Sequence, residues 1–391
     1  MSVKFTINTK ELKTLIEKVS TVINKKSVVS SLRRLYFAVT DNSISLLGTD
    51  MEKYIEVVSK DAYNTTPGTF GMDIEDSKVI SKMSGNITLE YVSDDKNKVI
   101  NLRCGKKILT MQGYDNVDDI KTPNMENEEN IMLCNENWLF DTLTNLAIFT
   151  SNDETKPAMQ YFNFNTKKKR IEALDGYRIG IRKIENQTIY AEYERTTLLH
   201  NSFVNVMKKL IDKKQENDVL VSQDVKYIKV SGKNYTYIER NAKQEYFRID
   251  QMLDMERGFS FDVNRKDFLD VMKYNTSLIN KHDMKPVILH SFNGNLYSYI
   301  CTCNYKSFDE LETKNNSTPG NMYIGFNPFY LLDAFNVIDS DEPHIVGLNN
   351  KAPFIITGNE YTVLTLSVSF GNTISNEECE RIFDEYMKKV A

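Results

Sequence analysis

One pattern of apolar and polar positions recurs along the chain: a short alternating stretch, a sharp stop, then apolar residues at helical spacing. Its clearest copy is 322–338, where the apolar residues of 322–326 have the period of a half-buried strand. Asn327 offers a side-chain cap, and Pro328 follows where a missing N–H costs nothing. The apolar stripe of the predicted helix is Leu331, Ala334, Phe335 and Ile338. The stretch predicts a strand that turns abruptly into an amphipathic helix.

The same plan returns in other parts of the chain. Asn8, Asn135 and Asn264 take the capping position in three copies, and Leu199 takes it in a fourth. Their apolar positions are Phe5, Ile7, Leu12, Leu15, Ile16 and Val19; Met132, Leu139, Leu143 and Leu146; Phe261, Val263, Phe268, Val271 and Met272; and Phe203, Val206, Met207 and Leu210. A degenerate copy lies in 68–83. The asparagines are about 130 residues apart, which predicts a threefold repeat with two units in each third.

Between these units, apolar runs of strand length alternate with polar turns, so each third is expected to form a β-rich sheet that carries two helices. The polar stretches 121–130 and 252–258 lack periodicity and are expected to be linkers. The chain is therefore predicted to be an α+β protein. Its expected divisions are domains 1–122, 129–252 and 256–370 and an extension at 371–391.

Composition narrows the class of protein. The net charge of −5 means that any contact with nucleic acid must come from a local basic surface. The five cysteines, an odd number without a CxxC pair, argue against a disulfide framework. No apolar run approaches the roughly 20 residues of a membrane span, and no signal peptide precedes Val3, so we expect a cytoplasmic protein.

No group of residues points to catalysis. The histidines are scattered, no serine or cysteine lies in a nucleophile motif, and there is no glycine-rich phosphate loop. Asp73, Glu75 and Asp76 resemble a cation-binding loop only loosely and suit a solvated helix start better. Asp175 beside Gly176 is typical of a structural turn. The sequence predicts no catalytic residue, no cofactor-binding residue and no metal ligand.

The repeat and several segments in a fixed order resemble the bacterial DNA sliding clamp family, the beta subunit of DNA polymerase III. The resemblance extends from Lys4 to about Val368. The segments that carry it are KFT (4–6), LLGTDME (46–52), ALDGYRIGI (173–181), IGFNPFYLLDAFNVI (324–338) and YTVLTLSV (361–368). It implies three clamp domains per chain, each with antiparallel sheets outside and two helices inside, in a ring closed by a head-to-tail homodimer.

The resemblance also implies a function. Such a clamp is not an enzyme and needs no cofactor; it encircles duplex DNA without sequence specificity and tethers the replicative polymerase. Its expected partners are the polymerase III alpha subunit, the clamp loader and other proteins with a clamp-binding motif. The alternative is a clamp-like interaction scaffold that keeps the fold but does not encircle DNA.

Residues expected to contact DNA phosphates are basic positions on the predicted helices and nearby loops. They are Lys10, Lys13, Lys25, Lys26, Lys78, Lys82, Lys156, Lys208, Lys209 and Lys273. The chain departs from the family where His200 and Asn201 replace a basic pair. The helices expected at 135–146 and 327–338 carry no lysine or arginine, and present Asp141 and Asp333 instead.

The resemblance places a groove for a short partner peptide between the second and third domains. The residues implied are Met159, Leu174, Gly176, Tyr177, Arg178, Ile179, Gln244, Arg248, Ile249, Thr362, Val363, Leu364, Thr365, Leu366 and Ser367. Their aliphatic members suit an apolar floor, and Arg178 and Arg248 are expected to hold carbonyls or carboxylates at the rim. Gln244 replaces a usual proline, and Thr365 and Ser367 replace a proline and an arginine.

Ring closure requires that one end of the chain complements the other. The first domain is expected to contribute a basic and apolar edge, and the third an acidic and apolar edge. The residues implied are Arg103, Lys106, Lys107 and Ile108 on one side and Leu278, Ile279, Asp309, Glu310 and Glu312 on the other.

The extension at 371–391 has the pattern of an amphipathic helix. Ser375 with Glu378 forms a capping box, and Ile374 with Cys379 suits a hydrophobic staple. The apolar positions are Cys379, Ile382, Phe383, Tyr386, Met387 and Val390. Two interpretations stay open: the helix packs on the outer face of the third domain, or it covers the peptide groove and competes with partners.

Overall fold

The structure of the protein is a computed structural model that describes residues 2–94, 97–115, 120–190, 196–254, 256–280, 285–302, 305–369 and 376–390. The chain packs into two compact units. Unit 1 comprises 1–143 and 186–243, and unit 2 comprises 144–185 and 244–391. The division into three domains stays a prediction.

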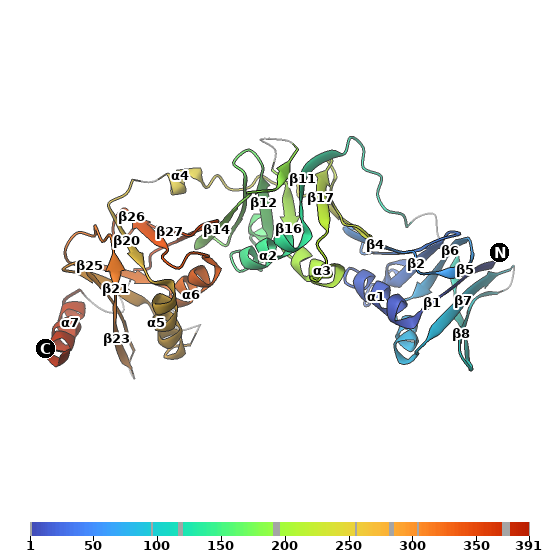
Figure 1. The fold of residues 1–391 in the computed structure, drawn as a ribbon, viewed down its shortest axis with the longest axis horizontal. Coiled ribbons are helices and arrows are strands. Elements are labelled where there is room, and N and C mark those ends of the chain that lie inside the picture. Colours follow the sequence, from blue (N-terminus) through green and yellow to red (C-terminus); the bar gives the residue numbers. More distant parts are fainter. Residues whose placement is uncertain are drawn as a thin grey trace. The chain divides into compact units, whose positions relative to one another are not determined.

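The described part of unit 1 contains two antiparallel sheets (Figure 1). Its strands are β1 (Ser2–Asn8), β2 (Arg34–Val39), β3 (Ile44–Thr49), β4 (Lys53–Ser59), β5 (Tyr63–Thr66), β6 (Gly68–Asp73), β7 (Asn86–Ser93), β8 (Lys98–Cys104), β9 (Lys107–Gln112), β10 (Tyr114–Asp115), β11 (Glu129–Asn135), β15 (Thr188–Ile189), β16 (Leu198–His200), β17 (Asp218–Gln223), β18 (Tyr227–Ser231) and β19 (Tyr235–Arg240). One sheet has the order β5-β1-β7-β8-β9, and the other β10-β6-β2-β3-β4-β19-β18-β17-β11-β15.

The helices of unit 1 are α1 (Thr9–Val19), η1 (Ser30–Arg33), η2 (Asp76–Lys82), α3 (Phe203–Leu210) and the first part of α2 (Glu136–Ala147). The α-helices of unit 1 bury apolar side chains, whereas the short η1 has no buried residue. The Asn8 side chain accepts a hydrogen bond from the backbone N–H of Lys10 at 2.9 Å, and the Asn135 side chain accepts one from Trp138 at 3.0 Å. Both predicted caps are confirmed.

The degenerate copy at 68–83 forms a strand followed by a 3₁₀ helix rather than an α-helix. From Ile74 onward its buried residues are Ile74, Ser77, Ile80 and Met83, which recur every three positions. Side chains three residues apart lie above one another in a 3₁₀ helix, so this period suits the tighter turn. The different helix type explains why the α-helical spacing is hard to recognise there.

Unit 2 contains a four-stranded sheet and a longer one, both antiparallel in the described residues. Its strands are β12 (Tyr161–Asn165), β13 (Arg170–Leu174), β14 (Arg178–Lys183), β20 (Phe259–Val263), β21 (Val287–Phe292), β22 (Asn295–Cys301), β23 (Lys306–Leu311), β24 (Thr313–Lys314), β25 (Met322–Phe326), β26 (His344–Gly347), β27 (Phe354–Thr357) and β28 (Tyr361–Thr365). The four-stranded sheet has the order β23-β22-β21-β25. Within unit 2 the longer sheet runs β12-β13-β14-β28-β27-β26-β20-β24.

The helices of unit 2 are η3 (Pro157–Gln160), α4 (Asp250–Leu253), α5 (Arg265–Ser277), α6 (Pro328–Val337) and α7 (Asn376–Val390). Asn264 caps α5 through the N–H of Asp267, and Asn327 caps α6 through the N–H of Phe329, as predicted. The α5 and α6 faces meet where the rings of Phe268 and Phe335 stack with centroids 3.9 Å apart. The predicted linker 252–258 instead begins inside the one-turn helix α4.

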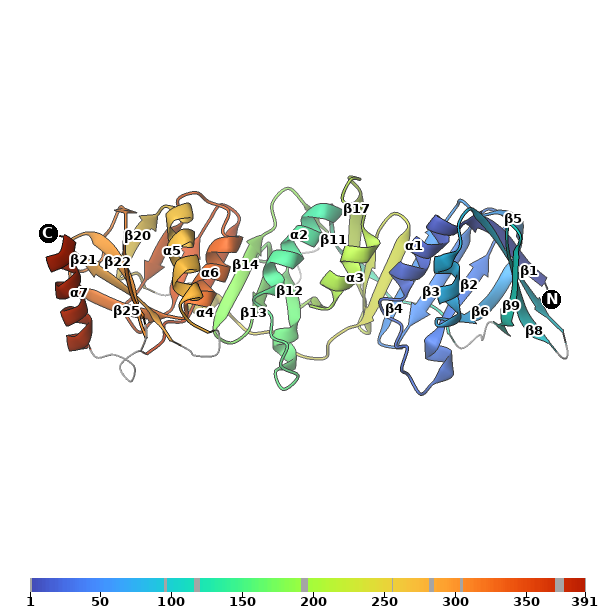
Figure 2. The same ribbon diagram turned by 90° about the horizontal axis from the view of Figure 1, so that it is seen from below.

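Helix α7, predicted from the spacing in 371–391, packs on the four-stranded sheet, where Figure 2 shows it beside β21 and β25. Cys379 and Ile382 join a buried cluster with Tyr299 of β22. The neighbouring Ser298 instead bonds Asn275 of α5. Because successive strand residues point to opposite faces, α5 and α7 cover opposite faces of this sheet.

The Phe383 ring lies 4.5 Å from the ring of His290, and Tyr386 stacks on Phe308 at 3.6 Å between ring centroids. Met387, predicted to lie on the apolar face of the helix, is 38% exposed and contributes less to this packing than predicted. The proposed capping box and staple involve Ser375 and Ile374, which lie outside the described residues. These contacts favour the packing interpretation of the extension.

Two further observations concern the described residues only. None of their helices is long and apolar enough to span a membrane. No group of three His, Cys, Asp or Glu side chains among them is arranged to hold a metal ion.

Candidate functional site

One face of the long sheet of unit 2 carries an apolar cavity of about 250 Å³. Its floor is formed where β14 pairs with β28, with Ile179 opposite Leu364. Its lining residues are Met159, Leu174, Gly176, Tyr177, Arg178, Ile179, Phe247, Arg248, Ile249, Met252, Leu364 and Leu366. Segments 159–179, 247–252 and 364–366 are far apart in the sequence, so this cavity exists only in the folded unit.

Most residues predicted for the peptide groove lie together in this cavity. Those that do not line it are Gln244, Thr362, Val363, Thr365 and Ser367. Val363 and Thr365 alternate with Leu364 on β28 and therefore point to the opposite face, where both are buried. Thr362 shares the face of Leu364 but lies two residues further along the strand.

Phe247 and Met252 line the cavity but were not predicted. Phe247 is 46% exposed and Met252 47% exposed. Large apolar side chains in an otherwise polar connecting segment were the signal that could have identified them, because such residues on a surface often mark a binding site.

The lip of the cavity is a tight turn that begins at Asp175. The Asp175 carboxylate accepts hydrogen bonds from the backbone N–H groups of Tyr177, at 2.9 Å, and Arg178, at 3.1 Å. Gly176 has a φ of +92°, which disfavours other residues. The turn holds Tyr177 with half of its side chain exposed, 6.0 Å from the ring of Tyr330. Asp175 therefore has the structural role that its sequence context predicts.

Arg178 is held inside unit 2 rather than presented to a partner. Its guanidinium donates to Asp175 at 2.9 Å, to Asp333 of α6 at 2.6 Å and to the carbonyl of Ile148 at 2.7 Å. Burial alone lowers the pKa of Arg178, but Asp333 and Asp175 raise it above its ordinary value. Three of its five N–H donors thus bind groups within unit 2, and the expectation that Arg178 holds partner carboxylates stays a prediction.

Arg248 is the cation that remains at the rim. It is exposed and makes no ion pair among the described residues. Asp333, expected to face DNA, is instead the counter-ion of Arg178.

The residues predicted to contact DNA fall into two sets. In unit 1, six lysines lie on helices: Lys10 and Lys13 on α1, Lys78 and Lys82 on η2, and Lys208 and Lys209 on α3. Lys25 and Lys26 lie in the loop that follows α1. Helix α1 packs against η2 and α3, so the six helical lysines come from adjacent helices. In unit 2, Lys156 lies 5.6 Å from the centroid of the Tyr177 ring, and Lys273 pairs with Asp270.

His200 does not replace the missing basic pair. Its Nδ1 accepts from the backbone N–H of Ser202 at 3.1 Å and lies 2.8 Å from the Ser202 hydroxyl, which accepts from Lys53. Burial and the nearby charge of Lys53 lower the pKa of His200 to about 4. His200 is therefore neutral at physiological pH and supplies no positive charge for phosphate.

Several of the residues predicted for the dimer interface lie on or beside an outermost strand, whereas Arg103 lies on the inner strand β8. In the described residues, β9 is the outermost strand of its sheet in unit 1, and β23 is outermost in the four-stranded sheet of unit 2. Ile108 on β9 is 70% exposed, beside Lys106 and Lys107. Asp309 and Glu310 lie on β23, Glu312 follows it, and Leu278 and Ile279 follow α5. The pairing of these two edges in a dimer stays a prediction.

Comparison with known proteins gives the relationship of the chain. The family described as the DNA polymerase III beta subunit, N-terminal domain, matches residues 3–118. A beta sliding clamp of Halalkalibacterium halodurans is 21% identical over 362 residues, which are 88% of this chain and 93% of the relative. The beta sliding clamp of Bacillus subtilis is 22% identical over 382 residues, 93% of this chain and 98% of the relative.

Solved structures show the same fold. A DNA polymerase III beta subunit from Eubacterium rectale superposes with a TM-score of 0.82 at 23% identity, covering 94% of this chain and all of that one. A Bartonella birtlesii sliding clamp bound to griselimycin gives a TM-score of 0.80 at 17% identity, with coverage of 94% and 100%. The architecture of sheets and helices is therefore that of these proteins.

Proposed function

We propose that the chain is a divergent member of the bacterial sliding clamp family, the beta subunit of DNA polymerase III, and that it acts as a processivity clamp. It would encircle duplex DNA and tether the replicative polymerase and other partners. The alternative of a scaffold that does not encircle DNA is not favoured, because the relatives that match most of the chain are named sliding clamps.

The observation that carries the proposal is the apolar cavity of about 250 Å³ whose floor is formed where β14 pairs with β28. Apolar walls with a few polar groups at the rim suit a short peptide with apolar anchors. The cavity is assembled from the residues that the family resemblance implies for partner docking. A non-catalytic tether needs such a site, and the proposal assigns the chain no enzymatic role.

Three clamp domains at 1–122, 129–252 and 256–370 would provide six domains for a head-to-tail dimer. The basic edge near Ile108 would meet the acidic edge of β23 in the second copy. Lysines on α1, η2 and α3 would contact phosphates, which carry no sequence information. The polymerase III alpha subunit, the clamp loader and other proteins with a clamp-binding motif are the proposed partners.

The tethering role is tested by the length of DNA that the replicative polymerase makes per binding event on a primed circle. With a clamp loader present, the wild-type chain is expected to lengthen the products. Met252→Glu should abolish the effect, because it places a charge in the apolar cavity. Met387→Glu on α7 is the matched control and should retain it. Equal product lengths with Met252→Glu and wild type would contradict tethering through this cavity.

Encirclement is tested separately by gel filtration of the chain loaded on nicked circular DNA. A topological link survives high salt, which removes simple electrostatic binding, and is lost when the circle is cut to a linear form. Salt-sensitive binding that does not depend on circularity would contradict a closed ring.

A further inference from the structure

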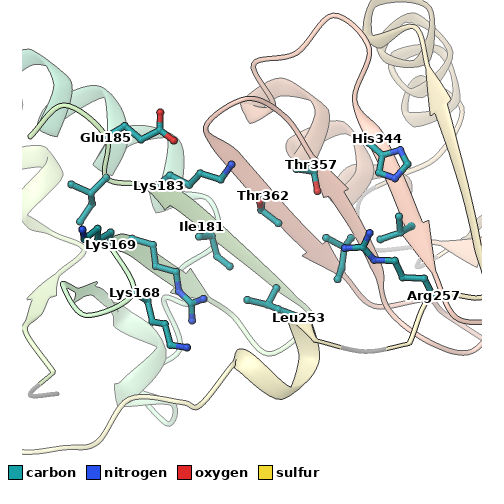
Figure 3. A pocket seen from close by; sticks show the side chains of 14 residues that line it. Lys168, Lys169, Ile181, Lys183, Glu185, Leu253, Arg257, His344, Thr357 and Thr362 are labelled. Carbon is teal, nitrogen blue, oxygen red and sulfur yellow. The ribbon is translucent and has the colours of Figure 1, made fainter. Parts of the chain in front are cut away.

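A second cavity, of about 530 Å³, opens on unit 2, and basic side chains dominate its rim (Figure 3). Lys169 and Lys183 enter from one side, and Arg257 and His344 from the other. The complete lining is Lys168, Lys169, Arg170, Ile181, Lys183, Ile184, Glu185, Leu253, Arg257, His344, Val346, Ile355, Thr357 and Thr362. Of these residues, the family resemblance had implied a docking role for Thr362 alone.

The second cavity continues the face that holds the apolar one. On β14, Ile179 lines the apolar cavity and Ile181 the basic one. On β28, Leu364 lines the apolar cavity and Thr362 lines the basic one. Residues two apart on a strand share a face and are separated by about 7 Å. An extended chain that leaves the apolar cavity therefore reaches the basic one within a few residues.

The charge of the lining is strongly unbalanced. Five lysine and arginine side chains line the cavity, and Glu185 is the one carboxylate among its lining residues. Some of these cations have counter-ions nearby: Arg170 pairs with Glu172 and with Asp250, and Lys168 lies 3.9 Å from Asp250.

These counter-ions leave other cations available. Lys183 is exposed, and its ammonium donates only a weak bond, at 3.3 Å, to the carbonyl of Asn359. Arg257 is exposed and makes no ion pair among the described residues. His344, in contrast, lies 2.6 Å from the carboxylate of Asp262. The positive charge that the cavity offers to a ligand therefore rests on Lys183 and Arg257.

The floor of the basic cavity decides between two kinds of anionic partner. Ile181, Leu253, Val346 and Ile355 form an apolar base beneath the charged rim. A duplex backbone presents phosphates on a wide, stiff surface and gains nothing from an apolar base. A peptide combines carboxylates with aliphatic carbon and can enter the cavity in extended form.

We propose that the basic cavity is a second docking site for the partner peptide and takes an acidic segment that flanks the apolar clamp-binding motif. This proposal rests on the proposed function, because the apolar cavity must first hold the motif. Acidic residues next to the motif then raise affinity and select among partners, since complementary charge contributes mainly to specificity and association rate.

The experiment measures peptide affinity by fluorescence anisotropy with the full chain. The probes are the clamp-binding segment of the replicative polymerase and the same segment extended by four glutamates at its N-terminal or C-terminal side. One acidic extension is expected to tighten binding about tenfold at low salt, the effect of a few exposed charge pairs together. The gain should shrink at high salt.

The double variant Lys183→Glu/Arg257→Glu should lose the gain while still binding the unextended segment normally. Lys266→Glu/Lys351→Glu, with the same change in charge at exposed sites outside both cavities, should keep the gain. If the gain is absent, or if it survives in the cavity variant, the proposal is overturned. Docking of the unextended segment in the apolar cavity would not be contradicted by that result.

Failure of the unextended segment to bind at all would instead overturn the proposed function, and this proposal with it. A short duplex DNA whose binding is weakened by the cavity variant, with no effect of the acidic extensions, would assign the cavity to nucleic acid and overturn the peptide proposal.

Discussion

Single residues determine how the groove is held in shape. Arg178 ties the lip turn at Asp175 to α6 at Asp333, and it also bonds the carbonyl of Ile148. Its guanidinium carbon lies 4.4 Å from the centroid of the Tyr330 ring. Because these partners come from different elements, one side chain fixes the position of the lip relative to the helix beneath it.

Replacing Arg178 with alanine should therefore destabilise unit 2. The change leaves two carboxylates without their counter-ion and is expected to lower the free energy of unfolding by about 3 kcal/mol. Urea denaturation followed by tyrosine fluorescence measures this loss. Arg381→Ala, which removes only exposed ion pairs to Glu378 and Glu385, is the matched control and should lose less than about 1 kcal/mol. Similar losses in both variants would refute the role given to Arg178.

The sequence identified most cavity residues only through resemblance, and periodicity alone would have assigned many of them to the core. Strand alternation from Leu364 could have removed Val363 and Thr365 from the predicted set. The pairing of Arg178 with Asp333 could not be predicted in the same way. The two residues are 155 positions apart, and nothing local to either indicates the other.

At the scale of elements, helix α7 changes the surface of the four-stranded sheet. Its Phe383 side chain is 5% exposed and contacts the rings of Phe292 and Tyr297. No α7 residue lines either cavity. The helix is therefore expected to stabilise unit 2 without affecting partner docking.

Phe383→Ala tests this separation of roles. Removing a buried ring is expected to cost about 3 kcal/mol of unfolding free energy, measured by urea denaturation. The affinity for the polymerase segment should stay unchanged. Glu385→Ala, on the exposed side of the same helix, should alter neither quantity beyond about 0.5 kcal/mol. An increase in peptide affinity with Phe383→Ala would instead support the interpretation that the extension competes with partners for the groove.

His290 beneath α7 should make this contact sensitive to acid. Burial lowers its pKa below 6.5, although the hydrogen bond with Asn321 opposes the shift. A histidine with a lowered pKa in the folded state contributes fully above pH 6.5, and its contribution is lost as the pH falls below that value. The loss is at most about 1.4 kcal/mol per pH unit.

Hydrogen exchange of the α7 amides, corrected for the intrinsic pH dependence of exchange, should show falling protection between pH 6.5 and 5. His290→Phe should flatten the profile, because no buried base remains to be protonated. His200→Gln is the control: His200 also has a lowered pKa, but it lies in unit 1 and should leave α7 unaffected. A profile that does not change in His290→Phe would exclude His290 as the cause.

The apolar period of 376–390 was enough to predict the helix. The sheet that it packs on was not predicted, although VILHSF (287–292) and LYSYIC (296–301) carry apolar residues at both odd and even positions, which is typical of strands buried on both faces. That signal could have indicated that the sheet is covered twice.

At the scale of the whole molecule, the sequence repeat and the packing divide the chain differently. Ile55 of β4 pairs with Tyr237 of β19, so one sheet joins strands of the first and second thirds. Ile179 of β14 pairs with Leu364 of β28, so another joins the second and third thirds. Such long-range pairings leave no trace in the sequence period. This is why the repeat could be predicted and the two packed units could not.

Assembly is expected to depend on the free edges of β9 and β23. Lys106→Glu/Lys107→Glu replaces positive with negative charge at one edge and should weaken a head-to-tail dimer, since like charges would then meet. Sedimentation equilibrium measures the dissociation of the dimer. The chain has a mass of 45.2 kDa, so a dimer that dissociates on dilution shows a clear loss of average mass. Lys266→Glu/Lys351→Glu, away from both edges, should sediment like the wild type. A dimer as stable in the edge variant as in the wild type would contradict this interface.

The closeness of the two cavities on β14 and β28 has a consequence for chemical probes. A small molecule with an apolar group for one cavity and a tethered carboxylate for the other would gain from the high effective concentration of its second group. Its residence time would then depend on Lys183 and Arg257 as well as on the apolar floor. A single substitution in one cavity would remove only one of the two contacts of such a ligand. It would therefore reduce the affinity of this ligand less than that of a ligand bound in the apolar cavity alone.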